Sequence, residues 1–387
     1  MKFLHTSDWH IGKKTDGRER IEEQRAVLKE IAEIAEREEA DAVLIAGDVY
    51  DTYIPSAEAE RLLFETLKTL SEKGMAVIAV SGNHDDAARL TAASALTEGT
   101  GIRLCGDIHE EIASGTAGRV KIAGGEGYAV LEKGEEKVFV ALCPYPSEAR
   151  FKESVREEES FEEKMRRWLY AGLSGNTEHL PAVLVGHFYV AGGTVSESER
   201  PIDLGGARAV LKEILPECNY IALGHLHKRQ VMSKSRNVYY SGAILEYAFD
   251  EAGWEKSVNV FEINGGKTEN IRQIPLRSGK KLMRLEAKGY DNARELLEKY
   301  RGYYTELTLL LSDPLTDLQI KTLKGENPDL LTLAFLFEGS IERETVSRKH
   351  LSDGELFAGY YETLYGKKPP EELAALFEEV LHETDQA

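Results

Sequence analysis

Five apolar segments of this chain end in the same way, and that shared ending constrains the fold more than any other feature. Each segment has the composition of a buried strand, and Asp, His or Asn follows it directly or within a few residues. The segments are FLHTSDWH (3–10), VLIAGD (43–48), VIAVSGNH (77–84), VLVGH (183–187) and YIALGHLH (220–227). In four of them a glycine directly precedes the polar residue, and glycine allows a sharp turn and close approach to a ligand.

Strands alternate with helices along the first half of the chain, which predicts an α/β domain. We expect strands at 2–6, 41–47 and 75–82, with helices at 19–38, at 56–74 (closed by Gly74) and at 86–97. A β-meander at 118–142, a charged helical stretch at 147–173 and strands at 181–186, 219–224, 237–242 and 257–263 complete this part. Sites in open α/β sheets form beyond the carboxyl ends of strands, so the five endings should converge in space.

The converging side chains form a candidate metal-binding set. Its members are Asp8, His10, Asp48, Asn83, His84, His187, His225 and His227. The set has no thiolate, which argues against structural zinc, and its imidazoles disfavour an all-oxygen calcium or magnesium site. Six or seven ligands are too many for one ion, but they suit two ions roughly 3.5–4 Å apart that share a carboxylate. One histidine after one strand is ordinarily structural; five such endings together favour the metal interpretation.

The remaining histidines are expected to be structural or to lie on the surface. They are His5, His109, His179, His350 and His382. The three cysteines, Cys105, Cys143 and Cys218, are widely spaced without a CxxC motif, which indicates reduced thiols in the cytoplasm. No apolar run approaches the ~20 residues that span a membrane, and the first residues do not resemble a signal peptide.

The net charge of −19 disfavours a nucleic-acid binder, because phosphate contacts need lysine and arginine. A local basic patch or a basic partner could override this sum. Basic residues that follow the ligand segments are candidates for such a rim: Lys13, Lys14, Arg18, Arg20, Lys228 and Arg229.

The predicted order of strands and helices changes near residues 275–281, where a small α+β domain is expected to begin. Its strands are expected at 281–288, 305–312 and 330–337, and its helices at 291–300 and 317–323. Helices are expected again from Ser352, where SDGE fits a capping box, and Pro369–Pro370 can open the last one. The predicted domains are therefore 1–276, 277–345 and 346–387.

The motifs DWH, GDVYD, GNHD, GH and GHLH, in this order, resemble the signature of calcineurin-like metallophosphoesterases. The longer stretches HTSDWHIG, AGDVYDT, SGNHDDAARL, ALGHLHK and YYSGAILEYAFDE are similar to the SbcD family of nuclease subunits, over about the first 265 residues. This resemblance implies a four-layer α/β/β/α sandwich with a small α+β capping domain. It also implies two Mn²⁺ ions (Mg²⁺ or another divalent metal in the cell), a homodimer, and an SbcC-type ATPase that binds the C-terminal helices. The helices at 56–73 and 86–97 are the candidate dimer surfaces.

The resemblance also implies roles for single residues. The ligands of the first ion would be Asp8, His10 and His227, those of the second Asn83, His187 and His225, and Asp48 would bridge both. His84 would bond the phosphate or protonate the leaving oxygen, with Asp85 orienting it, while the ions activate a shared water for in-line attack. Arg89, Lys13 and Lys14 are candidates for binding substrate phosphates. Asp51 stands where some relatives carry a histidine near the DNA end, so it is assigned no DNA contact.

The implied function is a Mn²⁺-dependent DNA nuclease, with double-strand exonuclease and single-strand or hairpin endonuclease activity. It would act on DNA ends and hairpins with the ATPase in break repair and end processing. Two alternatives stay open. One is a phosphoesterase acting on small substrates or phosphoproteins, and the other is a non-catalytic scaffold that bridges DNA ends.

Overall fold

The computed structural model describes residues 1–97, 99–146, 159–199 and 209–337, together with Tyr361, residues 368–370 and Leu373. The chain divides into two compact units, Met1–Leu309 with Leu315–Ala334, and Leu310–Pro314 with Phe335–Ala387. The domain boundaries predicted from the sequence stay predictions. Apart from the few residues just named, the predicted C-terminal helices lie outside the described part of the chain, as do residues 147–158 of the predicted charged helix.

A six-stranded sheet carries three of the five polar endings. Its order is β14-β13-β1-β2-β3-β4. The bounds are β1 (Lys2–Thr6), β2 (Ala42–Ala46), β3 (Ala76–Val80), β4 (Ile102–Cys105), β13 (Ser257–Asn264) and β14 (Lys267–Pro275). Strands β1 to β4 are parallel to one another, and β13 and β14 are antiparallel additions. The carboxyl ends of β1, β2 and β3 therefore lie side by side at one edge.

An eight-stranded sheet carries the other two endings, in the order β11-β12-β10-β9-β8-β7-β6-β5. The bounds are β5 (Gly115–Ala117), β6 (Val120–Gly125), β7 (Tyr128–Lys133), β8 (Glu136–Cys143), β9 (Ala182–His187), β10 (Tyr220–Gly224), β11 (Gln230–Ser233) and β12 (Val238–Tyr240). The predicted meander is confirmed as β6, β7 and β8. Strands β9 and β10 are parallel, so their polar endings also emerge together.

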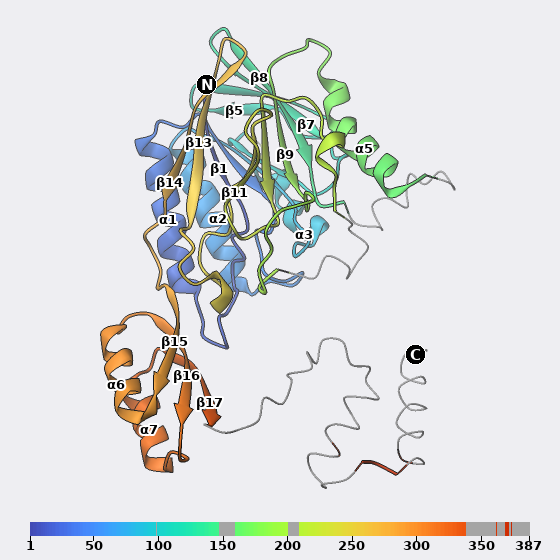
Figure 1. Ribbon diagram of the computed structural model, residues 1–387. Coiled ribbons are helices and arrows are strands. Elements are labelled where there is room, and N and C mark those ends of the chain that lie inside the picture. Colours follow the sequence, from blue (N-terminus) through green and yellow to red (C-terminus); the bar gives the residue numbers. More distant parts are fainter. Residues whose placement is uncertain are drawn as a thin grey trace. The chain divides into compact units, whose positions relative to one another are not determined.

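The two sheets pack face to face around a core that includes Phe3, Leu44, Val185, Tyr220 and Phe261. Helices α1 (Ile21–Arg37) and α2 (Ala57–Glu72) cover the outer face of the six-stranded sheet (Figure 1). Helix α5 (Phe161–Ala171) covers the outer face of the other sheet. The four-layer sandwich implied by the family resemblance is therefore confirmed.

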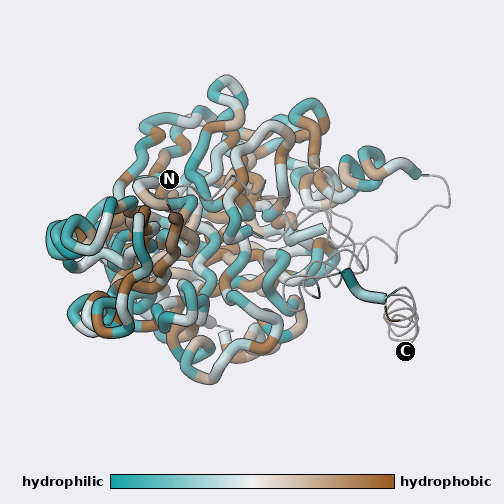
Figure 2. Tube along the Cα trace, turned by 60° about the horizontal axis from the view of Figure 1, so that its bottom comes forward, coloured by the Kyte–Doolittle hydropathy of each residue, from teal (hydrophilic) through white to brown (hydrophobic). Residues whose placement is uncertain are grey.

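The helices form where apolar side chains recur at helical spacing. In α1 the buried residues include Val27, Leu28, Ile31 and Ala35, and the hydroxyl of Ser56 caps α2 by accepting from the Ala59 amide. Along the trace in Figure 2, short hydrophobic stretches alternate with hydrophilic ones, as expected for elements that bury one face. The helix predicted at 86–97 is present as α3 (Ala87–Thr91) and a 3₁₀ turn, η1 (Ser94–Thr97).

The elements of the small α+β region follow the prediction closely. Its three-stranded sheet has the order β15-β16-β17. The bounds are β15 (Leu282–Lys288), α6 (Gly289–Lys299), β16 (Tyr304–Leu311), α7 (Asp317–Glu326) and β17 (Leu330–Phe337). Among the helices that the structure describes, none is long and apolar enough to cross a membrane.

Candidate metal centre

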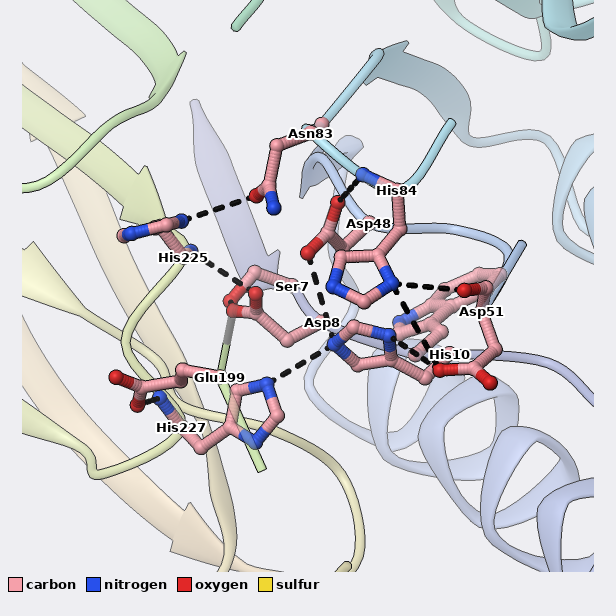
Figure 3. Close-up of polar contacts among 12 residues, drawn as sticks. Ser7, Asp8, His10, Asp48, Asp51, Asn83, His84, Glu199, His225 and His227 are labelled. Carbon is pink, nitrogen blue, oxygen red and sulfur yellow. Dashed lines mark hydrogen bonds and ion pairs between the residues drawn. The ribbon is translucent and has the colours of Figure 1, made fainter. Parts of the chain in front are cut away.

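The side chains predicted from the five strand endings converge at one edge of the two sheets. Figure 3 shows the residues of four of these endings, among them Asp8, Asp48 and His225. Three groups of them place one ligand atom each within 4.8 Å of the others: Asp8, His10 and His227; His10, Asp48 and His84; and Asp8, Asp48 and His187. All of these side chains are buried. The groups overlap, so the ligand atoms form one continuous cage.

Several residues of this cage have left-handed backbone conformations. Asp8, His10, Asp48 and His225 all have positive φ, at 52°, 45°, 49° and 105°. Residues other than glycine rarely adopt such values, and each costs of order 1–3 kcal/mol unless the surroundings compensate. Four such residues in one cluster of metal-ligand side chains indicate a functional site.

Two of the glycines that precede the polar residues are required by close packing. A Cβ on Gly47, whose φ is +81°, would lie 2.3 Å from Nδ1 of His187. A Cβ on Gly224 would lie 1.8 Å from the carbonyl oxygen of Ala46. These glycines therefore bring the endings of the two sheets into contact.

One part of the cage, the carboxylate-backed half, consists of Asp8, His10 and His227. The Nε2 atoms of His10 and His227 are 2.9 Å apart (Figure 3). Nδ1 of His10 lies 3.4 Å from a carboxylate oxygen of Asp51, and Nδ1 of His227 lies 3.1 Å from one of Glu251. If each Nδ1 carries the proton, both Nε2 lone pairs point at each other. A cation between them relieves this repulsion, so these residues fit a metal ion.

The other part, the backbone-backed half, consists of Asn83, His187 and His225. The Oδ1 atom of Asn83 lies 2.9 Å from Nε2 of His187 and 3.0 Å from Nδ1 of His225. Nδ1 of His187 lies 2.8 Å from the carbonyl oxygen of Ala46 in β2. A neutral backbone group therefore holds this imidazole, with its Nε2 directed at the amide oxygen. Imidazole nitrogen and amide oxygen are suitable donors for a divalent cation.

Asp48 lies between the halves. Its Oδ2 is 3.6 Å from Nε2 of His10 and 3.4 Å from Nε2 of His187, and its Oδ1 accepts from the His84 amide at 2.8 Å. Burial alone would raise the pKa of Asp48, but the neighbouring imidazoles of His187 and His84 outweigh it and hold that pKa well below its usual range. The carboxylate is therefore ionised and faces both halves.

The imidazoles of the cage differ in their pKa values. Burial lowers the pKa of His10 well below its usual range and that of His225 to about 3. Burial also acts to lower the pKa of His187 and of His227, but the Asp48 carboxylate raises the pKa of His187 to about 9, and the Glu251 carboxylate raises the pKa of His227. A ligating imidazole must be neutral, so cation binding competes with protonation of His187 and His227.

The role of Asp85 in orienting His84 stays a prediction, and the contacts described for the Asp85 carboxylate are with backbone amides. The Asp85 carboxylate accepts from the amides of Val49, Tyr50 and Gly82, at 2.8–3.1 Å. It therefore ties together the loops after β2 and β3, and burial raises its pKa to about 6. Nδ1 of His84 instead lies 2.7 Å from the carbonyl oxygen of Asp51 (Figure 3).

The candidate basic rim is mostly engaged in contacts within the chain. Lys13 pairs with Asp51 at 2.9 Å, Lys14 with Glu19, Arg89 with Glu60 and Arg229 with Glu255. Lys228 lies over the ring of Trp254, and Arg18 donates to the carbonyl oxygen of Pro328. Arg20 does not belong to the rim. Only 1% of it is exposed, and it bonds Glu23, Thr15 and the carbonyl oxygens of Glu246 and Lys280.

Histidines outside the cage behave as predicted where the structure describes them. His5 is buried and bonds Tyr220 and the carbonyl oxygen of Leu223, while His109 is exposed and pairs with Glu126. His350 and His382 lie outside the described residues.

The supporting residues Asp51, Glu199, Ser198 and Glu251 were missed as parts of the site, because none stands at a strand ending. The only signal for Glu251 is its place in the stretch YYSGAILEYAFDE.

Comparison with known proteins agrees with this geometry. The family model described as calcineurin-like phosphoesterase matches residues 1–229. A Bacillus subtilis protein, named as the SbcD subunit of the nuclease SbcCD, is 36% identical, with 98% of this chain and 97% of that protein covered. The chain belongs to the calcineurin-like phosphoesterase family, among its SbcD-type members. A Staphylococcus epidermidis protein of the same name is 29% identical over 94% of this phosphoesterase and 93% of the relative.

Two solved structures resemble the fold of this phosphoesterase more distantly. One is a dimetal phosphatase from Danio rerio, with 12% identity, a TM-score of 0.41, and coverage of 72% of this chain and 99% of that chain. The other is the protein TT1561 of Thermus thermophilus, with 15% identity, a TM-score of 0.39, and coverage of 71% and 99%. Family membership together with the buried donor set makes this chain a metal-dependent phosphoesterase that holds divalent cations.

Proposed function

We propose that this chain is the nuclease subunit of an SbcCD-type complex that hydrolyses phosphodiesters in DNA with two Mn²⁺ ions. The observation that carries the proposal is the cage itself, in which Asp48 faces one ligand set on each side. The relatives named as SbcCD nuclease subunits match nearly the whole chain, including the part beyond the phosphoesterase match, which supports DNA as the substrate. We further propose double-strand exonuclease and single-strand or hairpin endonuclease activity.

Asp8, His10 and His227 would hold one ion and Asn83, His187 and His225 the other, with Asp48 shared. Bound divalent cations would supply Lewis-acid stabilisation of the phosphoryl oxygens and a water of lowered pKa. The protein's own contribution to proton transfer is His84. Its backbone amide is fixed by Asp48, and the Asp51 carbonyl oxygen keeps a proton on Nδ1. Nε2 is then the atom that passes a proton to the leaving oxygen, after which the ring is neutral.

DNA affinity is proposed to come largely from the assembly. The chain is strongly acidic, and the candidate rim lysines and arginines already pair with carboxylates. An SbcC-type ATPase bound through residues 346–387, and a second copy of this chain, would supply the missing contacts. Exposed apolar side chains on the two candidate dimer helices support the homodimer: Phe64 and Leu96 are 37% and 85% exposed.

The test is Mn²⁺-dependent digestion of linear and hairpin DNA by the wild type and by His84→Gln. The variant should lose about 10²- to 10⁴-fold in cleavage rate, because general acid catalysis contributes that much, and it should still bind Mn²⁺. His109→Gln, which changes an exposed imidazole, is the control with unchanged activity.

Two outcomes would contradict the proposal. Hydrolysis of p-nitrophenyl phosphate esters but not of DNA, even with the SbcC-type ATPase present, would indicate a small-substrate phosphoesterase. Binding of DNA ends without any Mn²⁺-dependent cleavage would indicate a scaffold.

A further inference from the structure

A buried ion pair lies directly behind one metal ligand. Glu251 ends the 3₁₀ turn η4 (Phe249–Glu251) and is 0% exposed. Its Oε1 is 3.1 Å from Nδ1 of His227, and its Oε2 is 2.5 Å from Nζ of Lys256. Lys256 also donates to the carbonyl oxygen of His227 at 3.1 Å. The pair thus contacts both the ring and the backbone of a single ligand.

A hydroxyl completes the network. Oγ of Ser198 lies 2.5 Å from Nδ1 of His227 and donates to Oε1 of Glu251. Because Nδ1 faces these oxygen acceptors, the neutral ring carries its proton there. Nε2 is then left as the ligand atom, and it points toward Nε2 of His10, 2.9 Å away (Figure 3).

Stability alone does not explain this ion pair. Glu251 and Lys256 are 0% and 8% exposed, and the desolvation of two charges offsets most of their attraction. Apolar residues of similar volume would commonly be as stable at such a position. The contact with His227 supplies the missing reason, because a carboxylate behind a ligating imidazole orients the ring and raises its basicity.

The opposite half of the centre uses a different support. Nδ1 of His187 faces the carbonyl oxygen of Ala46 at 2.8 Å, which is a neutral group fixed by strand β2. A change at Glu251 therefore reaches one half of the centre and not the other.

We propose that Glu251, neutralised by Lys256, is a positioning residue for His227 that sets the cation affinity of the carboxylate-backed half alone. The inference rests on the two-ion centre of the proposed function. It assigns a role to the stretch YYSGAILEYAFDE, which the metal ligands themselves leave unexplained.

The test is a titration of the full-length chain with Mn²⁺ alone, following free Mn²⁺ by electron paramagnetic resonance. The wild type should bind two ions. Glu251→Gln should weaken one of them about 10- to 100-fold and leave the other unchanged, as is typical when a residue behind a ligand is altered. Glu246→Gln is the matched control. Glu246 is buried in the same segment, but it bonds the amides of Leu282 and Gly253, so both affinities should stay at the wild-type value.

Glu251→Gln leaves the buried ammonium group of Lys256 without its carboxylate partner, and an unpaired buried charge destabilises a fold. A second variant therefore separates loss of folding from loss of the ligand support. The double variant Glu251→Gln with Lys256→Met removes both charges and should show the same loss at one ion. Wild-type affinity for both ions in either folded variant would overturn the inference, and so would equal weakening of both. A wild type that binds fewer than two ions would instead overturn the two-ion centre of the proposed function.

Discussion

In the carboxylate-backed half, His10 and His227 turn Nδ1 toward Asp51 and Glu251, whereas in the backbone-backed half His187 turns Nδ1 toward a carbonyl of β2. Each half combines two imidazoles with one side-chain oxygen, but the supports behind the imidazoles differ in charge and in origin. A side-chain support can be removed by one conservative substitution. A backbone support is part of the sheet, so no side-chain substitution removes it. Only a substitution that displaces the imidazole sterically can break the contact. The two halves should therefore respond to different mutations.

The largest effect is expected where the halves meet. Asp48→Asn removes the charge that faces both His10 and His187 while it keeps the size of the side chain. Because both ions would lose a ligand, phosphodiester hydrolysis should fall by on the order of 10³-fold or more, and both Mn²⁺ affinities should drop together. Measurement of DNA cleavage and Mn²⁺ stoichiometry on the same preparation tests this. Hydrolysis near the wild-type rate would show that Asp48 does not join the halves.

A smaller and more selective loss is expected from Gly47→Ala. The new methyl group would meet the His187 ring at 2.3 Å from Nδ1, so the ring must leave its present position, in which Nε2 lies 2.9 Å from the Asn83 amide oxygen. Mn²⁺ binding should fall from two ions to one, with the carboxylate-backed half retained, and activity should drop about 10²-fold because a misplacement of ~1 Å has that cost.

Gly17→Ala is the control for backbone strain in this experiment. Gly17 has a similar φ of +78° but nothing within 4 Å of the added Cβ. If it lost an ion as Gly47→Ala does, the effect would come from strained backbone and not from the His187 ring.

The difference between ligands and supports also explains how far the sequence could predict the centre. Each ligand follows an apolar strand, and the parallel strands bring Asp8, Asp48 and Asn83 to one edge, so the pattern is visible without a structure. Glu251 comes from a short turn and Asp51 from a loop, and no periodicity marks either residue. Asp85 stands beside His84 in the sequence, yet its carboxylate points to the backbone of two loops.

The strands of the fold also differ in how well the hydrophobic pattern of the sequence predicts them. The central strands were predicted, but the four edge strands of the two large sheets, β4, β5, β11 and β14, were missed. Three of them have four residues or fewer, and the longest, β14, reads KTENIRQIP with no apolar run. An edge strand pairs on one side only and is commonly short and polar, so hydrophobic pattern is a weak guide to it.

The smallest expected effect concerns a buried imidazole outside both halves. His5 faces the hydroxyl of Tyr220 and the carbonyl oxygen of Leu223, each at 3.2 Å, and has no carboxylate support. Burial lowers its pKa from 6.5 to about 3. As the pH falls below 6.5, the unfolded chain therefore binds a proton at His5, whereas the folded chain does not. The free energy of unfolding decreases as a result. Between pH 8 and pH 6 this amounts to about 1 kcal/mol. His5→Gln should remove that part of the pH dependence when urea unfolding is measured with EDTA present. An unchanged slope would show that the folded and unfolded chains bind a proton at His5 equally well, so that burial without a carboxylate does not exclude the charged imidazole.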